Sequence, residues 1–315
     1  MSAGASKIVL GSRGSELARV QTAMVTEALR RVWPAIEVSV EIITTRGDEG
    51  SRGPVGAIDP RAGRKGLFTG EIERALAAGE IDVAVHSAKD LPSEMTPGLE
   101  VAAVLPRAPV EDVLIRKSLP EPVGLFGGCT VATGSVRRQY QLRWKYSGIE
   151  VVDVRGNVPT RLRKLISNEW DAMVLARAGV ERLGYDLAQG TFDFDGAVLC
   201  AEILPRQEFL PAGGQGVIAL QTRKDDNRTI ATVDRVNDPD TLLCLQAERE
   251  FLRLLQGDCG SPVGVLATIE GSMLKLQAQV FEPGRVAPRA GTVEGPVEEG
   301  GAGLAALLME RINGD

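Results

Sequence analysis

The sequence predicts an α/β protein with a small α+β C-terminal domain. Short β-branched runs alternate with helical patterns along most of the chain, which favours α/β architecture. After residue 228 the pattern changes to a helix, three short strands and a last helix, which suits a separate small domain. A chain of 315 residues also exceeds what one hydrophobic core usually serves, so we expect two or three domains.

The first set of elements is delimited by capping residues and a proline. Ser15 and Thr69 each stand where a helix N-cap is expected, and Pro34 marks the end of the first helix. Residues 36–44 alternate in the period of a strand, whereas the Gly- and Pro-rich residues 46–66 predict a long loop. The expected elements are strand 7–10, helix 15–32, strand 36–44, helix 69–78 and strand 81–85.

A second α/β set follows and leads into the C-terminal domain. The Pro- and Gly-rich residues 205–216 break it before another strand. The second set is strand 130–133, helix 136–146, strand 150–154, helix 158–167, strand 171–176 and, after the break, strand 217–221. The C-terminal set is helix 239–256, strands 263–269, 273–280 and 288–293, and a helix from about 303.

Composition restricts the classes of function. The net charge of −6 argues against general affinity for nucleic acid, and no apolar run reaches the length of a membrane span. The start of the chain lacks the apolar stretch of a secretory signal, so we expect a cytoplasmic protein. Four cysteines without CxxC spacing and a single histidine disfavour a zinc site. We expect most of these thiols to be reduced and buried.

Cations follow the predicted strands with unusual regularity. In open α/β sheets, ligands bind beyond the carboxyl ends of the strands. For a single arginine, a solvated surface charge is the simpler interpretation, but agreement among the ends of several strands favours a shared anion-binding cleft. The cations concerned are Arg13, Arg46, Lys89, Arg137, Arg138 and Arg155.

The ligand of this cleft need not be a nucleotide. Neither GxxxxGK[ST] nor a GxGxxG after a strand occurs in the chain. Arginine outnumbers lysine in these turns, which favours planar groups bound bidentately, carboxylates as well as phosphates. Asp90 is the one carboxylate among the cations. The pattern predicts a site for a small polycarboxylate, with Asp90 facing a developing cation.

Eight motifs extend along nearly the whole chain: GSRGSELA at 11–18, TTRGD at 44–48, GRKGLF at 63–68, VHSAKDLP at 85–92, ATGSVRRQ at 132–139, VRGNVPTRL at 154–162, LPAGGQG at 210–216 and GDCGSPVG at 257–264. Taken together and in this order, they resemble the porphobilinogen deaminase (hydroxymethylbilane synthase) family.

The resemblance implies a fold and a reaction. Two domains are expected to be type II periplasmic-binding-protein-like with a hinge crossed twice: residues 1–106 with 205–224, and residues 107–204. Residues 225–315 would form the small α+β C-terminal domain. The family joins four porphobilinogen molecules head to tail, releases ammonia, and hydrolyses off hydroxymethylbilane for porphyrin and heme biosynthesis. A dipyrromethane cofactor, held by a thioether, primes the chain.

The resemblance also implies roles for residues of this chain. Asp90 would be the catalytic carboxylate, which stabilises the azafulvenium cation formed when porphobilinogen loses ammonia. Cys259 would carry the dipyrromethane. The residues expected to bind cofactor and substrate carboxylates are Arg13, Ser15, Lys65, Lys89, Thr133, Ser135, Arg137, Arg138, Arg155, Arg161 and Arg182.

Several residues of these motifs allow more than one interpretation. We expect His86 to position its turn rather than to transfer protons, and Asp48 to hold its own loop. Asp258 stands where the family usually has glycine, and its charge disfavours a thiolate at Cys259. The 46–66 loop looks longer than usual and carries Arg61 where a lysine is common.

Two other functions remain as alternatives. A non-catalytic carboxylate-binding protein of the same fold would need neither Asp90 facing its ligand nor Cys259. A cysteine hydrolase using Cys259 and His86 would leave the strand-end arginines unexplained. The mass of the intact protein distinguishes them, because only the deaminase carries an added dipyrromethane. The family is usually monomeric, so we expect a monomer whose partner is the small-molecule substrate porphobilinogen, without nucleic acid or membrane.

Overall fold

The computed structural model describes residues 6–44, 69–117, 125, 127–256, 261–285 and 287–314. Five residues singled out in the sequence lie outside these ranges and receive no structural account: Asp48, Arg61, Lys65, Asp258 and Cys259. The same holds for the 46–66 loop, including Arg46. Within the described ranges, no helix has the length and apolar composition needed to cross a membrane.

The first sheet has five strands in the order β2-β1-β3-β11-β4. β1 pairs in parallel with β2 and β3, whereas β11 is antiparallel to both β3 and β4. A buried core that includes Ile8, Leu10 and Val85 packs on this sheet. The strands are β1 (Lys7–Arg13), β2 (Glu37–Ile43), β3 (Val83–Ser87), β4 (Leu99–Val104) and β11 (Ile218–Arg223).

The second sheet has six strands in the order β7-β6-β8-β5-β10-β9. β6 is parallel to β7 and β8, and β5 is antiparallel to β8 and β10. Its core includes Val113, Met173 and Phe194. The strands are β5 (Asp112–Lys117), β6 (Thr130–Ala132), β7 (Glu150–Val152), β8 (Ala172–Ala176), β9 (Thr191–Phe194) and β10 (Ala197–Ile203).

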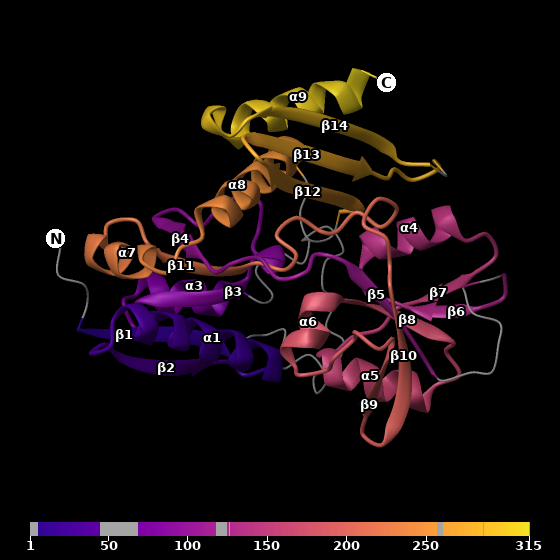
Figure 1. Ribbon diagram of the computed structural model, residues 1–315, viewed down its shortest axis with the longest axis horizontal. Helices are drawn as coiled ribbons and strands as arrows, with labels where there is room; N and C mark the ends of the chain where they lie inside the picture. Colours follow the sequence, from indigo (N-terminus) through magenta and orange to yellow (C-terminus); the bar gives the residue numbers. More distant parts are fainter. Residues whose placement is uncertain are drawn as a thin grey trace.

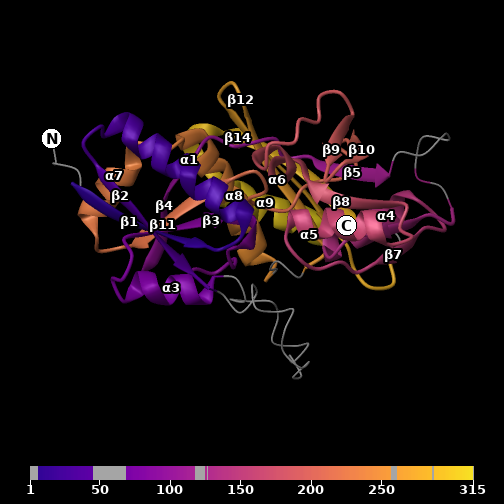
Figure 2. The ribbon, with the colours of Figure 1, turned by 90° about the horizontal axis from the view of Figure 1, so that it is seen from below.

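The third sheet is a separate antiparallel meander. Its strands β12 (Val263–Glu270), β13 (Met273–Val280) and β14 (Arg289–Pro296) pack with helices α8 (Pro239–Leu254) and α9 (Gly301–Gly314) around a core of their own. This small α+β unit lies above the other two sheets in Figure 1. Figure 2 shows those two sheets side by side, with α1 (Glu16–Val32) on the first and α5 (Val158–Ser167) on the second.

The chain crosses between the first two sheets twice. It leaves the first sheet after β4 and enters the second at β5, then returns from β10 to β11. β11 therefore lies between β3 and β4, although it follows them by more than a hundred residues. With the strands of each sheet numbered in chain order, the first sheet has the order 2-1-3-n-4 and the second has the order 2-1-3-n-5-4. In both, n is the strand that the chain enters directly after crossing from the other sheet, β11 in the first and β5 in the second. This is the type II periplasmic-binding-protein-like arrangement that the sequence predicts.

Most predicted elements are present with shifted ends. Ser15 caps α1 by accepting a hydrogen bond from the Ala18 backbone N–H at 3.4 Å. Thr69 stands at the N-cap of α3 (Gly70–Ala77), but its hydroxyl makes no capping bond, a correction to its predicted role. The described helices also include α4 (Val136–Lys145), α6 (Arg177–Arg182) and α7 (Asn227–Asp234).

The helix α7 packs on β4 and β11 of the first sheet, and its Val233 is part of that sheet's core. The sequence predicts that the C-terminal domain begins at residue 225, which would assign α7 to that domain. Because α7 buries its apolar face against the first sheet, we propose a boundary between Asp234 and Pro239 instead.

Candidate functional site

Asp90 lies at the end of a tight turn that follows β3. Ala88–Asp90 form one turn of 3-10 helix. The Ala88 N–H donates to the carbonyl of Val217, in the segment 204–217 that returns from β10 to β11 and is called the returning hinge segment below. The Asp90 side chain is half-buried. Within the described part of the chain no hydrogen bond to its carboxylate is found, so this carboxylate is not committed to holding the turn.

Gly214 packs against the Ala88–Asp90 turn at a position that has no room for a side chain. Gly214 has a φ of +74°, and a Cβ there would lie 2.9 Å from both the Ala88 carbonyl carbon and the Lys89 nitrogen. Backbone cannot yield as a flexible side chain can. Gly214 therefore sets how closely the hinge segment approaches the turn that carries Lys89 and Asp90.

We expect Gly214→Ala to lower kcat/KM on the order of 100-fold, because displacing reacting groups by about 1 Å has that effect. Gly79→Ala is a matched control, since Gly79 has a φ of +75° but nothing within 4 Å of the position that a new methyl group would take. Gly79→Ala should lose roughly 1 kcal/mol of unfolding free energy through the left-handed backbone, and Gly214→Ala should lose more, because its methyl group must also displace backbone atoms. Steady-state kinetics of both variants measures kcat/KM, and denaturant unfolding measures their stability. Equal activity in the two variants would contradict the role given to the contact between Gly214 and the Ala88–Asp90 turn.

Arg137 and Arg138, at the start of α4, share one buried carboxylate. Asp112, at the start of β5, accepts from Arg137 Nη2 at 2.9 Å and from Arg138 Nη2 at 2.7 Å. Burial alone would raise the pKa of Asp112, but the two guanidinium groups and the hydrogen bonds hold it well below its usual range. Burial lowers the pKa of Arg137, against the opposing effect of Asp112. These arginines are therefore fixed in place rather than solvated.

Lys89 of the first sheet lies within electrostatic reach of this cluster on the second. Burial lowers the pKa of Lys89 to about 8, with Asp90 opposing the shift and Arg138 reinforcing it. Asp112 and Arg137 act on the same ammonium, with opposite signs. The Lys89–Asp90 turn and the arginine pair, nearly fifty residues apart in the sequence, are also linked by packing, because Gly214 lies against that turn and its neighbour Gln215 donates to Asp112 at 2.8 Å.

Three of the predicted arginines keep a donor that no described group satisfies. The Nε atoms of Arg137, Arg138 and Arg182 are buried and have no hydrogen-bond partner. A buried unsatisfied donor costs about 1–3 kcal/mol, and more when charged. Arg182 Nη2 donates to the Gly216 carbonyl at 2.7 Å, which brings α6 against the hinge, and burial lowers its pKa to about 10. Three orphaned guanidinium donors fit a group that carries carboxylates, as a dipyrromethane does.

The carboxyl end of β1 contributes further predicted residues to the region around the Lys89–Asp90 turn. Arg13, half-buried at the end of that strand, acts electrostatically on His86. Ser15 caps α1 with its hydroxyl, so it serves the helix in addition to any ligand. Gln21 of α1 and Ser87 of β3 exchange hydrogen bonds of 2.9 and 3.1 Å, which ties the helix to the strand that leads into the Lys89–Asp90 turn.

The remaining predicted residues gather at the carboxyl ends of β6 and β7. Thr133 accepts from the Ser135 N–H at 3.2 Å, and Ser135 stands at the N-cap of α4 without a side-chain cap. Arg155 is exposed and pairs with Asp153 at 3.1 Å. Arg161 Nε donates to the Gly156 carbonyl at 2.7 Å. The two loops touch, since a Cβ at Gly134 would lie 2.5 Å from the Val154 carbonyl.

His86 is part of a buried hydrogen-bond chain behind the Lys89–Asp90 turn. It is 4% exposed, and its Nε2 donates to Gln221 Oε1 at 3.0 Å, since that oxygen can only accept. Gln221 donates in turn to Glu73, whose other oxygen accepts from Thr96. Burial lowers the pKa of His86 to about 4. The geometry matches the positioning role that the sequence favours over proton transfer.

His86 should stay neutral until the pH approaches 4, and its resonance can be followed alone because the chain has one histidine. Its pKa in the fold is depressed below the ordinary 6.5, so the unfolded chain binds more protons between these values. Its contribution to stability is therefore complete above pH 6.5 and is lost as the pH falls towards 4. Proton NMR of the imidazole tests this, and a midpoint near 6.5 would contradict it.

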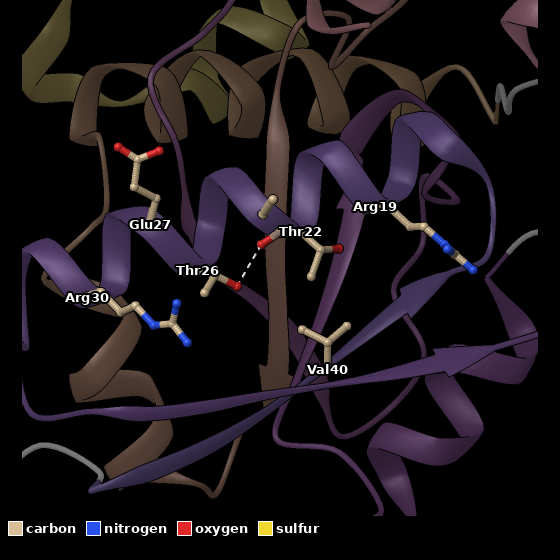
Figure 3. A pocket seen from close by; sticks show the side chains of 7 residues that line it. Arg19, Thr22, Thr26, Glu27, Arg30 and Val40 are labelled. Carbon is tan, nitrogen blue, oxygen red and sulfur yellow. Dashed lines mark hydrogen bonds between the residues drawn. The ribbon is translucent and has the colours of Figure 1, made fainter.

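A separate cavity lies between α1 and β2 (Figure 3). It measures about 400 Å³ and is lined by Arg19, Thr22, Ala23, Thr26, Glu27, Arg30 and Val40. None of these residues is predicted for the site. A second cavity of about 550 Å³ borders β12 and the segment 105–111, which leads from β4 to β5. Arg107 and Cys244 are among the residues that line it. Neither cavity contains Asp90, so neither is the site described above.

Three of the four cysteines can be placed. Cys129 and Cys244 are buried, as predicted, and Cys200 is half-buried. Burial raises the pKa of the Cys244 thiol to about 12, with Glu248 acting in the same direction. Cys244 is thus held protonated in the C-terminal core.

Sequence reasoning missed the polar residues that organise the hinge. Asp112, Gln215 and Glu248 are buried, and Glu248 accepts from Arg107 at 2.6 Å and from the Gly214 N–H at 2.7 Å. Gln215 donates to Asp112 at 2.8 Å. A usable signal exists for Asp112: it precedes the apolar run VLI, where a lone acid needs a buried cation.

The fold and this site define a class of protein: an α/β protein whose two sheets are joined by a double crossing and whose predicted anion-binding arginines, together with Asp90, lie where the two sheets meet. Comparison with known proteins identifies the family. The family model "Porphobilinogen deaminase, dipyromethane cofactor binding domain" matches residues 8–231, and "Porphobilinogen deaminase, C-terminal domain" matches residues 242–309. The chain belongs to the porphobilinogen deaminase family.

Individual relatives agree with this assignment. The chain is 41% identical to the porphobilinogen deaminase of Roseiflexus sp. (strain RS-1) over 309 residues, which cover 97% of this chain and 95% of that protein. It is 39% identical to the porphobilinogen deaminase of Moorella thermoacetica over 313 residues, 98% of this chain and 95% of that protein. Separately, and with no bearing on this assignment, the chain is similar among solved structures to the periplasmic VFT2 domain of BvgS from Bordetella pertussis, with a TM-score of 0.44, 15% identity, and coverage of 73% of this chain and 86% of that one.

Membership of the family settles the function at the level of the reaction. The protein is an enzyme of tetrapyrrole biosynthesis that acts on porphobilinogen, forms hydroxymethylbilane and has a dipyrromethane cofactor. The predicted family, fold class, function and cofactor are therefore confirmed.

Proposed function

We propose that this enzyme is a cytoplasmic, monomeric transferase that carries its dipyrromethane on Cys259, and that Asp90 is its catalytic carboxylate. The observation that supports this site is structural: Gly214 packs against the turn that carries Lys89 and Asp90, and its neighbour Gln215 donates to Asp112, the carboxylate that Arg137 and Arg138 share. Three of the residues that the sequence predicts for binding, Arg137, Arg138 and Arg182, have a buried donor without a partner among the described residues.

Asp90 acts on charge that develops in the substrate. Loss of ammonia from porphobilinogen leaves a cation, and coupling places positive charge on a pyrrole nitrogen. A carboxylate about 4 Å away at an effective dielectric of ~20 stabilises such a charge by about 4 kcal/mol. Because ground-state porphobilinogen lacks that charge on its ring, the stabilisation acts mainly on the transition state.

The cations bind carboxylates and do not take part in bond making. Arg137, Arg138 and Arg182 would hold acetate and propionate groups of the cofactor through their Nε–H donors. Lys89 would hold a substrate carboxylate beside Asp90. Bound, the cofactor supplies the pyrrole carbon on which the chain grows. Arg13, Ser15, Lys65, Thr133, Ser135, Arg155 and Arg161 complete the proposed binding set.

Intact mass and product analysis test the proposal together. The purified protein should be heavier than its sequence by one dipyrromethane, and porphobilinogen should be converted to hydroxymethylbilane with one ammonia released per pyrrole. A protein of bare mass that binds porphobilinogen without turnover would instead be the carboxylate-binding alternative. Size-exclusion chromatography with light scattering tests the monomer, and cell fractionation tests the location.

A further inference from the structure

Arg137 is held on three sides, and one of its supports, Gln141, is in turn hydrogen-bonded to the C-terminal domain. Its Nη1 donates to Gln141 Oε1 at 2.7 Å and to the Leu210 carbonyl at 2.9 Å, and its Nη2 donates to Asp112. Both hydrogens of Nη1 are thereby used. The Nε–H remains as the buried donor for which the described residues offer no partner. The orientation of that donor is therefore set by the groups that bind the opposite edge of the guanidinium.

Gln141 is the centre of these supports. It is 0% exposed and one helical turn after Arg137 on α4. Its Nε2 donates to the Leu210 carbonyl at 2.9 Å and to Gln279 Oε1 at 3.0 Å. Because one amide group makes three bonds, its own rotation is restricted. Gln141 thus links the arginine, the returning hinge segment and β13.

Gln279 extends the link into the C-terminal sheet. It lies on β13, is 7% exposed, and its Nε2 donates to the Glu208 carbonyl at 3.4 Å. The same interface has an aromatic contact, in which Trp144 of α4 meets Phe281 edge-on at 6.0 Å. Trp144 therefore packs the two domains together through its ring, whereas Gln279 reaches the arginine through the hydrogen bonds of Gln141.

We propose that Gln141 and Gln279 are positioning residues for carboxylate binding, through which the C-terminal domain orients the Arg137 guanidinium. This inference rests on the proposed role of Arg137 in binding cofactor or substrate carboxylates. The physical reason is geometric: a bidentate or charge-assisted bond to a carboxylate depends on the direction of the N–H donors. A guanidinium that loses the hydrogen bonds at its Nη1 atom can rotate, and its Nε–H donor then no longer has a fixed direction.

The experiment is a double-mutant cycle on the holoenzyme. Gln279→Met should raise the KM for porphobilinogen, or the fraction of purified protein without cofactor by intact mass, about three- to tenfold, with kcat per loaded molecule within twofold. Gln141→Met should have the larger effect of the two. If that core variant does not fold, Gln279→Met alone carries the test, since Gln279 lies nearer the surface.

Arg137→Lys provides the second arm of the cycle. Lysine keeps the charge but has no fork to orient, so Gln279→Met should have no further effect in that background. Trp144→Leu is the control, because it weakens the same domain contact and should act equally in both backgrounds. An equal effect of Gln279→Met in the two backgrounds would overturn the inference. A wild-type protein without turnover, or an Arg137→Lys enzyme with unchanged KM and cofactor content, would instead refute the proposed function of the site.

Discussion

Asp90→Asn should retain the fold and the cofactor but lose turnover by about a thousandfold. The amide has the shape of the carboxylate but not its charge, and about 4 kcal/mol of Coulomb stabilisation corresponds to roughly three factors of ten in rate. The described part of the chain places no hydrogen bond on this carboxylate, so its loss should not weaken folding. Single-turnover kinetics with porphobilinogen and intact mass measure the two quantities separately.

Asp90→Glu separates charge from position. Glutamate keeps the negative charge but extends it by one methylene, so its activity should lie between those of the wild type and the asparagine variant. Denaturant unfolding of all three proteins serves as the check on folding. Near-normal formation of hydroxymethylbilane by Asp90→Asn would show that another group stabilises the cation.

The approximate site is predictable from the sequence because the topology of α/β sheets is simple. Strand ends meet at one edge, so cations that follow strands converge whatever lies between them. The sharing of Asp112 by Arg137 and Arg138 is not predictable in this way, because that pairing joins β5 to α4 across β8. Such a pairing is set by tertiary packing, about which sequence periodicity and local propensity carry no information.

A hairpin and a helix that the sequence analysis does not predict nevertheless have local signals. β9 and β10 form a hairpin whose loop is Asp195–Gly196, both with positive φ, between runs of alternating polarity. An Asp-Gly pair so placed favours a two-residue turn. The helix α7 begins in the charged residues 223–228, where Asp226 caps it through the Thr229 N–H at 3.0 Å. β4 has a local signal as well, because the turn pair Pro97-Gly98 directly precedes it and Gly98 has a positive φ.

The sequence also does not show which cations remain available for a ligand. Arg107 follows β4 much as Arg13 follows β1, but the carboxylate of Glu248 binds it at 2.6 Å, and that acid comes from the C-terminal domain. A cation at a strand end is a candidate for binding only until its partner is known. The partners of Arg107 and Arg137 lie 141 and 25 residues away.

Cys259→Ser should fold but carry no dipyrromethane and make no tetrapyrrole. The family resemblance makes this thiol the thioether anchor, and serine cannot form that bond. The other three cysteines serve as matched controls. Cys129 and Cys244 are buried and Cys200 is half-buried, so changing each to alanine should cost about 1 kcal/mol of unfolding free energy at most and leave the cofactor in place. Intact mass of the four variants distinguishes the anchor from the controls.

Asp258 provides a finer test of the same anchor. A carboxylate beside the thiol disfavours the thiolate, so Asp258→Gly should load cofactor onto empty protein faster than the wild type. The difference should narrow as the pH rises, because the thiol then ionises in both proteins. Cys244, whose thiol pKa burial raises to about 12, offers no comparable thiolate at neutral pH. Peptide mapping that found the adduct on Cys129, Cys200 or Cys244, or an active Cys259→Ser enzyme, would refute the attachment at Cys259.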